Sequence, residues 1–332
     1  MRDPSFWWRE DSRAAALLSP LAALYGAIAA SRLTQKGVRA AVPVICIGNP
    51  TVGGAGKTPV AIAVARMLDA EGYKPFLLSR GYGGRHKGPL IVDTARHAAR
   101  DVGDEPLLLA RTAPTVIARR RERGAVAAVE AGANVIVMDD GFQNPSVKKD
   151  LSILVIDARR GIGNGRVVPA GPLRAPLAPQ FARADALLVI GDGHAAEGVV
   201  RMAKGLRVFR GRLAPDPGAA STLKAQRVLA FAGIGDPEKF FATLRQSGVA
   251  VEEQRSFPDH HRYARDEADD LVAAAERHGL ALVTTEKDIV RLAGDPATAQ
   301  LAARATALPV TLALDDAAGF RTFVLGRLTP GA

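Results

Sequence analysis

The segment from residue 42 to residue 71 limits most strongly what this chain can fold into. It starts with a short β-branched run, Val42–Ile47, continues through a glycine-rich stretch, and leads into an apolar helix-forming stretch that begins at Pro59. A buried strand, a glycine loop and a helix in this order predict a phosphate-binding P-loop, because glycines let backbone N–H groups wrap phosphate oxygens. The residues predicted to bind the nucleotide are Thr51, Val52, Gly53, Gly54, Ala55, Gly56, Lys57 and Thr58.

Two details of this loop bear on the nucleotide. The usual P-loop pattern has glycine at its first position, where this chain has Thr51, and the double glycine at 53–54 is an alternative source of the turn. Lys57 is expected to reach the β and γ phosphates. The Asn-Lys-x-Asp pattern that recognises guanine is missing, since Lys287 and Asp288 are adjacent, so ATP is favoured as the nucleotide. A chance glycine-rich turn is the alternative interpretation.

A second chemical signal follows the hydrophobic run 134–138, which ends in Asp139-Asp140-Gly141. The carboxyl ends of parallel strands meet at one edge of a sheet, so both aspartates are expected beside the P-loop. Kinases and ATPases hold Mg²⁺ with a hydroxyl of the P-loop and with carboxylates. We therefore predict Thr58 with Asp139 or Asp140 as the ligands of Mg²⁺, and an ordinary Asp-Gly turn is the alternative.

The rest of the chain alternates buried strands with helices. Its 332 residues correspond to roughly two domains. We predict an α/β fold with a P-loop domain, in which helices cover a mostly parallel sheet, and a smaller α/β second domain. A Pro/Gly-rich stretch at 211–226 marks the boundary, and strands at 281–284 and 309–313 are assigned to the second domain. The predicted divisions are an N-terminal helix at 1–36, the P-loop domain at 37–225 and the second domain at 226–332.

Charge and the N-terminus indicate acidic partners. The chain carries 44 Lys and Arg against 34 Asp and Glu, a net charge of +10, which suits nucleic acid, phosphorylated small molecules or an anionic membrane. Trp7 and Trp8 precede an uncharged run, 14–30, that is short for a spanning helix and contains Pro20. We predict an interfacial helix on an anionic membrane surface, and an ordinary docked helix is the alternative. The single cysteine, Cys46, excludes a disulfide framework.

An ordered set of short motifs runs along nearly the whole chain. These motifs are Thr51-Val-Gly-Gly-Ala-Gly-Lys-Thr-Pro59, Ser79-Arg-Gly-Tyr82, Gly103-Asp-Glu105, Asp139-Asp-Gly-Phe-Gln143, Gly163-Asn-Gly165, Pro169-Ala-Gly-Pro-Leu-Arg174, Gly233-Ile234, Phe257-Pro-Asp-His260 and Thr284-Thr-Glu-Lys-Asp288. In this order they resemble the tetraacyldisaccharide 4′-kinase family of lipid A biosynthesis. The Asp-Asp-Gly-Phe-Gln motif with Asp-His far downstream is the most specific part of the resemblance.

The resemblance implies ATP-dependent phosphorylation of the 4′ hydroxyl of a tetraacylated glucosamine disaccharide 1-phosphate, a lipid A precursor. It also implies a peripheral protein on the cytoplasmic face of the inner membrane, held there by the N-terminal helix. No nucleic acid is expected as a partner, and no obligate protein partner is inferred. A membrane-associated P-loop ATPase of the partitioning or metallochaperone type is the alternative, although such a protein needs no downstream Asp-His motif.

By the same resemblance, Asp104 and His260 act together on the proton of the attacking hydroxyl. Lys57 and Asp140 complete the predicted catalytic set, and the two domains must close to bring His260 to Asp104. From the residues alone, Asp104 could equally cap a helix and His260 could lie in a solvated turn. The predicted substrate-binding residues are Ser79, Arg80, Tyr82, Asn164 and Arg174.

The chain departs from the family pattern at Ala175, because a glutamate usually follows the arginine at position 174. Asp139, Asp140 or Glu105 could take the role of that carboxylate, or the role could be dispensable. The basic run Arg119–Arg123 is interpreted as a solvated helix face rather than as a binding patch.

Overall fold

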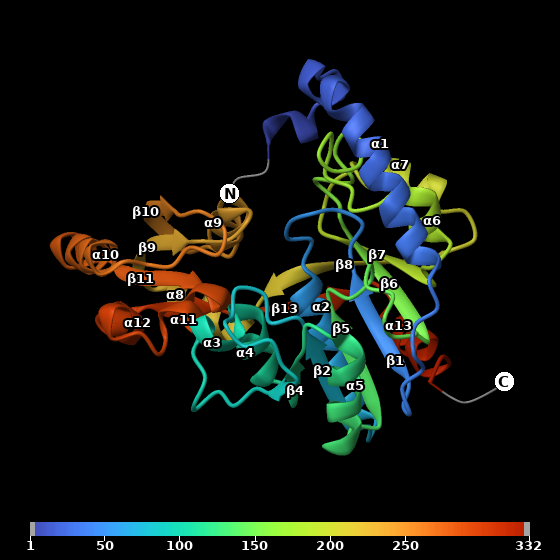
Figure 1. The fold of residues 1–332 in the computed structure, drawn as a ribbon. Coiled ribbons are helices and arrows are strands. Elements are labelled where there is room, and N and C mark those ends of the chain that lie inside the picture. Colours follow the sequence, from blue (N-terminus) through green and yellow to red (C-terminus); the bar gives the residue numbers. More distant parts are fainter. Residues whose placement is uncertain (1–3, 329–332) are drawn as a thin grey trace.

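The computed structural model describes residues 4–328, which form two lobes with one sheet each (Figure 1). Residues 1–3 and 329–332, the ends of the predicted first and last divisions, lie outside the described residues. The nine-stranded sheet of the first lobe has the order β13-β8-β7-β6-β1-β5-β2-β4-β3. Its strands are β1 (Val44–Gly48), β2 (Pro75–Ser79), β3 (Leu90–Ile91), β4 (Thr115–Ile117), β5 (Val135–Asp139), β6 (Leu151–Asp157), β7 (Ala186–Ile190), β8 (Arg207–Pro215) and β13 (Val310–Leu314).

Helices cover both faces of this sheet, as its uninterrupted apolar strands require. Alternate residues of β1 enter different cores: Ile45 and Ile47 pack on the side of α2 and α13, whereas Val44 and Cys46 pack on the side of α1 and α5. The helices of the lobe are η1 (Ser5–Trp8), α1 (Arg13–Thr34), α2 (Lys57–Ala70), α3 (Ala99–Val102), α4 (Asp104–Ala110), α5 (Arg121–Glu130), α6 (Leu177–Phe181), α7 (Glu197–Met202) and α13 (Ala317–Leu325).

The second lobe is built on a four-stranded sheet with the order β10-β9-β11-β12, in which every neighbouring pair is parallel. Phe231 and Phe241 are fully buried in its two cores. Its strands are β9 (Arg227–Ala232), β10 (Ala250–Ser256), β11 (Ala281–Thr285) and β12 (Thr306–Leu308). Its helices are α8 (Pro217–Lys224), α9 (Pro237–Gln246), α10 (Arg265–His278), α11 (Glu286–Leu292), η2 (Pro296–Thr298) and α12 (Ala299–Arg304).

The end of the chain returns to the first lobe, which differs from the predicted division at 226–332. The strand expected at 309–313 is β13, and it pairs antiparallel with β8 at the edge of the large sheet. Phe320 and Val324 of α13 then pack into the core beside α2. The assignment to the second domain was wrong because a short apolar strand does not encode which sheet it joins. The predicted boundary stretch at 211–226 is divided between the lobes. Strand β8 of the first lobe ends at Pro215, and α8 belongs to the second lobe.

The N-terminal segment is anchored to the first lobe at its start, whereas most of α1 is exposed. The indole Nε1 of the buried Trp7 donates to the carbonyl oxygen of Pro169 over 2.9 Å, and the Ser12 side chain caps α1. Among residues 4–328, α1 is the one helix that is long and apolar enough to cross a membrane by length and composition. Only 17% of its most apolar window is buried within the protein. The helix therefore carries an apolar surface that the rest of the fold leaves uncovered.

The lobes meet where loops leave the carboxyl ends of both sheets. Gly235, in the loop between β9 and α9, lies against the P-loop, because a Cβ at this position would be 3.9 Å from the amide nitrogen of Gly54. On one side of this contact Lys239 of α9 forms a 2.9 Å ion pair with Asp157. The fold thus places the turn after β9 directly over the predicted phosphate-binding loop.

Candidate active site

The P-loop lies where the sequence predicts it, between β1 and the first turn of α2. Gly53 and Gly56 take positive φ angles of 100° and 84°, a conformation that glycine adopts without a steric penalty. Lys57 begins the helix and is 9% exposed, with its Nζ 3.8 Å from an Asp140 carboxylate oxygen. Gly54 has open space where a side chain would be, so the loop leaves room for phosphate groups.

Thr51, the departure from the P-loop pattern, is part of a short β-bridge. It pairs with Leu173, and the next amide, that of Val52, donates to the carbonyl oxygen of Pro172 over 2.8 Å. The Thr51 carbonyl in turn accepts a 2.8 Å hydrogen bond from Arg174 Nε. The loop therefore enters as an extended, anchored strand, and Gly53 supplies the left-handed residue that follows.

The predicted magnesium ligands lie together at the end of β5. Thr58 Oγ1 donates to Asp139 Oδ2 over 2.9 Å, and Asp139 is 1% exposed. The other oxygen, Oδ1, is buried without a hydrogen-bond partner in the part of the chain that the structure describes. Burial, together with the nearby Glu105 carboxylate, raises the pKa of Asp139 to about 7. A buried carboxylate beside a P-loop hydroxyl, with one oxygen that has no hydrogen-bond partner among the described residues, fits a Mg²⁺ ion.

Asp140 lies between two cations. Arg174 donates to both of its carboxylate oxygens over 2.9 and 3.1 Å, and Lys57 approaches one of them. Burial by itself would raise the pKa of Asp140, but the charges of Lys57 and Arg174 outweigh it and lower that pKa. Arg174 is thus placed beside the phosphate loop, and its contact with substrate stays a prediction.

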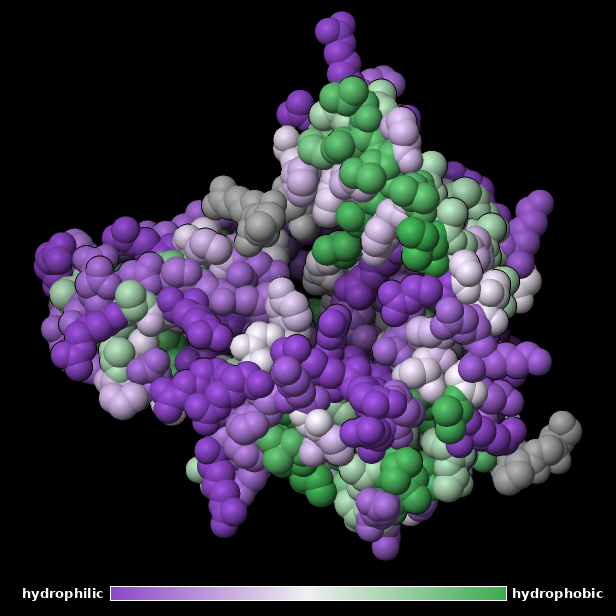
Figure 2. Space-filling view, in the orientation of Figure 1, coloured by the Kyte–Doolittle hydropathy of each residue, from purple (hydrophilic) through white to green (hydrophobic). Residues whose placement is uncertain are grey.

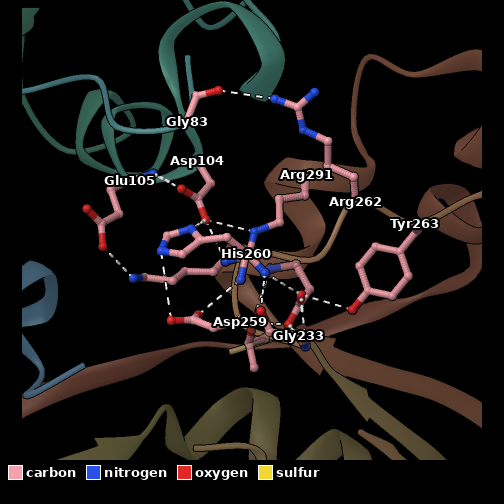
Figure 3. Close-up of polar contacts among 12 residues, drawn as sticks. Gly83, Asp104, Glu105, Gly233, Asp259, His260, Arg262, Tyr263 and Arg291 are labelled. Carbon is pink, nitrogen blue, oxygen red and sulfur yellow. Dashed lines mark hydrogen bonds and ion pairs between the residues drawn. The ribbon is translucent and has the colours of Figure 1, made fainter. Parts of the chain in front are cut away.

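Asp104 and His260 meet across the junction of the lobes (Figure 3). Asp104 is the first residue of α4, His260 follows β10, and the imidazole Nδ1 lies 3.1 Å from Asp104 Oδ2. The other ring nitrogen, Nε2, faces Asp259 at 4.0 Å, and Asp259 lies beside Gly235 on the P-loop side. The predicted pair is therefore in contact, and the second ring nitrogen faces Asp259 on the P-loop side.

Electrostatics keep the two partners in different states. Burial alone would raise the pKa of Asp104, but the hydrogen bond with His260 and the charge of Arg291 hold it well below its usual range. The same hydrogen bond raises the pKa of His260 above the ordinary imidazole value. Asp104 is consequently ionised at any physiological pH, and His260 readily holds a proton.

The second lobe supplies two cations that the sequence did not assign to the site. Lys287 Nζ forms a 2.7 Å ion pair with Glu105, and Arg291 Nε donates to Asp104 over 2.7 Å. Both residues lie on α11, one helical turn apart. The Thr284–Asp288 motif pointed to this helix, but nothing in the sequence showed which of its side chains would reach the first lobe.

The remaining predicted substrate residues divide into two groups. Ser79 is buried at the end of β2, Arg80 is exposed, and the exposed Tyr82 packs edge-on against His260 with ring centroids 5.4 Å apart. This loop therefore borders the Asp104–His260 pair. Asn164 does not, because its amide donates to the carbonyl oxygens of Phe6 and Ala170 and holds the N-terminal segment.

Arg121 differs from its sequence interpretation. It was placed on a solvated face, but it is 2% exposed, donates to the Ala118 carbonyl and has a buried Nε without a hydrogen-bond partner among residues 4–328. Burial and the neighbouring Arg80 lower the pKa of Arg121 to about 10, against the attraction of Asp140. A buried guanidinium with an unused donor near the twin aspartates is suited to an anionic ligand.

His261 and Ala175 have structural surroundings. His261 Nε2 lies 2.7 Å from Glu267, and its ring stacks on Phe257. Ala175 is fully buried in the core beside α5, and its carbonyl accepts from Gln180. Neither side chain reaches the Asp104–His260 contact in this arrangement.

A phosphate loop, a carboxylate suited to Mg²⁺ and an Asp–His pair at the junction of two lobes define a P-loop phosphotransferase with a hydroxyl acceptor. Residues 14–329 match the family model for tetraacyldisaccharide-1-P 4′-kinase, and the chain belongs to this family. It is an ATP-dependent kinase of lipid A biosynthesis, and the alternative of a partitioning-type ATPase is not favoured.

Named relatives and a solved structure agree with this membership. A tetraacyldisaccharide 4′-kinase of Rhodopseudomonas palustris (strain BisA53) is 57% identical over 99% of this chain and 96% of that protein. One of Nitrobacter hamburgensis is 53% identical over 99% of this chain and 98% of the relative. The crystal structure of LpxK from Aquifex aeolicus in complex with ATP superposes with a TM-score of 0.75 and 28% identity, covering 95% of this chain and 99% of that one. The predicted family and fold class are thereby confirmed.

Proposed function

We propose that this chain transfers the γ-phosphoryl group of ATP to the 4′ hydroxyl of a tetraacylated glucosamine disaccharide 1-phosphate, with His260 as the proton acceptor. The observation that carries the proposal is the 3.1 Å contact between His260 Nδ1 and Asp104 at a lobe junction that also covers the P-loop. A sugar hydroxyl is a poor nucleophile, so a base within reach of its proton accelerates transfer.

The proton moves from the sugar hydroxyl to His260 Nε2. Because Nδ1 faces the ionised Asp104, the neutral ring carries its proton on Nδ1 and leaves Nε2 as the acceptor. As the new O–P bond forms and the bond to ADP breaks, the hydroxyl proton passes to Nε2, and Asp104 stabilises the resulting imidazolium. The proton then returns to solvent when the lobes open.

The first lobe holds the donor. The backbone of 53–56 and the Lys57 ammonium would bind the β and γ phosphates, while Thr58 and Asp139 would hold Mg²⁺. When bound, Mg²⁺ supplies positive charge to the phosphate oxygens. Arg174 keeps the Asp140 carboxylate beside Lys57, and Arg121 adds a buried positive charge near both aspartates. Ser79, Arg80 and Tyr82 border His260 and are proposed to contact the acceptor sugar.

We propose that α1 holds the enzyme on the cytoplasmic face of the inner membrane. Its apolar side chains at positions spaced for one helix face are 45–83% exposed. Figure 2 shows them as a hydrophobic stripe along the helix. They are Leu17, Leu21, Leu24, Tyr25 and Ile28. Burial of each large apolar chain in lipid would contribute about 1.5–3 kcal/mol, and the basic residues that follow the helix suit an anionic surface.

Closure of the lobes is part of the proposal. Asp104 and Glu105 belong to the first lobe, whereas His260, Lys287 and Arg291 belong to the second, so the base is assembled only when the lobes are together. Closure also covers the P-loop with the turn at Gly235, which would keep water from the phosphoryl group. Of the predicted domain at 226–332, the residues up to about 308 belong to the second lobe and would take part in this closure.

The decisive experiment incubates the protein with γ-labelled ATP and a tetraacyl disaccharide 1-phosphate in detergent micelles. The new phosphomonoester is then located on the sugar by NMR. We expect the label at the 4′ oxygen, with turnover that depends on His260. Label recovered only as free phosphate, or on another oxygen, would contradict the proposed reaction.

A further inference from the structure

Arg291 connects the two halves of the Asp104–His260 pair. We propose that it is a positioning residue for the phosphoryl transfer: from the second lobe, it fixes both the carboxylate and the backbone of the histidine when the lobes close. This inference rests on the proposed role of His260 as the proton acceptor.

The guanidinium contacts both lobes. Its Nε donates to Asp104 Oδ2 of the first lobe over 2.7 Å, while its Nη1 donates to the Gly233 carbonyl and to Asp288 Oδ1 of the second, the latter over 2.8 Å. The side chain is only 6% exposed, so water does not replace these partners. Figure 3 shows Arg291 between Asp104 and Gly233.

The Gly233 carbonyl also holds the backbone of the histidine. The amide of His260 donates to this oxygen over 3.1 Å, and His260 has a φ angle of 55°. That left-handed conformation is disfavoured for a residue with a side chain, so it persists only where neighbours enforce it. By bonding to the same carbonyl, Arg291 ties the position of the imidazole to the position of Asp104.

Arg291 is itself held by a fully buried carboxylate. Asp288 accepts hydrogen bonds from the Gly233 amide at 3.1 Å, from the Tyr263 hydroxyl at 2.9 Å and from Thr285 Oγ1 at 2.6 Å. These contacts leave the carboxylate one orientation toward the guanidinium. The fork geometry of arginine lets three acceptors be engaged at once, which a lysine ammonium on a flexible stem does not reproduce.

The contact between Arg291 and Asp104 also determines how strongly Asp104 attracts the protonated imidazole of His260. Asp104 is shared between His260 and Arg291, so the positive guanidinium offsets part of its attraction for the imidazolium. Without the guanidinium, the full charge of Asp104 would act on His260, and the ring would keep its proton to a higher pH. The charged groups that act directly on His260 are Asp104 on α4, Asp259 on its own loop and Lys287 on α11. Tyr82, on the loop after β2, packs against the ring, and Arg291 acts on it through Asp104.

The test compares Arg291→Met with Arg291→Lys in the kinase assay between pH ~6 and pH ~9. We expect Arg291→Met to lower kcat by about 10- to 100-fold near neutral pH. The loss should shrink as pH rises, because the acid limb of the profile, in which kcat increases as His260 loses its proton, moves to higher pH. Arg291→Lys should keep the acid limb near its original position. The KM for ATP should not change, because the P-loop residues are untouched. Arg304→Met, which removes an exposed arginine of the same lobe, is the matched control.

Two outcomes would overturn the inference: a loss of the same factor at every pH, or a lysine variant with the same pH profile as the methionine variant. Circular dichroism checks folding, and if Arg291→Met does not fold, Arg291→Gln takes its place with the same expectation. His260→Ala separates this inference from the proposed function. If that variant keeps full activity, the proton acceptor is misassigned; if it is inactive while Arg291→Met leaves the acid limb unmoved, only the role of Arg291 fails.

Discussion

The P-loop and the Asp104–His260 pair are neighbours, but they are built in different ways. Lys57 and Thr58 begin α2 directly after the loop that follows β1, and Asp139 ends the neighbouring strand β5, so the nucleotide site is built from the first lobe alone. The pair takes one residue from each lobe. The comparison teaches that nucleotide binding and proton acceptance are separable: changes in the first region should alter ATP binding, and changes in the second should alter turnover alone.

The largest effect is expected from Lys57→Ala. The ammonium is the buried cation of the P-loop, and without it the charge that develops on the phosphoryl oxygens is not balanced. We expect kcat/KM to fall by about 10³-fold with a folded protein, and the affinity for ATP, measured by calorimetry, to fall as well. Lys204→Ala changes an exposed lysine of the same lobe and serves as the control. Unchanged activity of Lys57→Ala would refute the phosphate-binding role.

His260→Ala tests whether turnover can be lost while ATP binding at the P-loop is kept. We expect kcat to fall by about 10²-fold or more, because the proton acceptor is removed, while the affinity for ATP stays near that of the unaltered protein. His261→Ala should cost less turnover, since that ring contacts Glu267 and Phe257 within its own lobe. If His261→Ala proved the more damaging change, the base would have to be reassigned.

The pH dependence tests the same pair without a mutation. His260 must be neutral to accept a proton, and its pKa is raised by the hydrogen bond to Asp104, so kcat should rise through an acid limb that lies above pH ~6.5. The stability of the closed lobes depends on pH in the opposite sense. The ion pair of protonated His260 with Asp104 stabilises the joined lobes fully below pH ~6.5, and this contribution is lost as pH rises through the raised pKa of His260. A kcat profile that falls between pH ~6 and pH ~8 would contradict the assignment.

A smaller effect on turnover is expected from changes in α1, far from both regions. Leu21→Ser with Leu24→Ser removes two exposed side chains of the apolar stripe. We expect binding to anionic vesicles to weaken by about 10²-fold, from the lost burial of two leucines, while kcat with a detergent-dispersed acceptor changes by less than about threefold. Ala16→Ser with Ala23→Ser, two exposed alanines of the same helix, is a matched control in flotation assays. Undiminished vesicle binding by the leucine variant would place the membrane contact elsewhere.

Local patterns were enough to predict the P-loop and the position of Asp139. Each depends on residues close in sequence: a β-branched run, a glycine loop with its lysine, and aspartates at the end of a strand. The pairing of Asp104 with His260 was expected from the family resemblance, because no spacing rule connects residues that lie on separate lobes.

Three features could not be predicted from the sequence for a common physical reason. The burial of Arg121, the contact of Arg291 with Asp104 and the addition of β13 to the large sheet all depend on which distant elements pack together. A basic run such as 119–123 has the same composition whether it faces water or a carboxylate. Likewise, the apolar residues at 310–314 would fit the edge of either sheet.

The pairing of β13 with β8 has a mechanical consequence. Pro215 is paired with Val310, and the amide of Asp216 donates to the Pro309 carbonyl over 2.9 Å. The backbone thus leaves the large sheet and rejoins it at neighbouring residue pairs of the same two strands. The segment between them is an insert whose backbone is connected to the large sheet at one place. If the lobes open as proposed, this insert would move without distorting the strands that carry the phosphate loop, and its deletion would need only a short linker between two neighbouring ends.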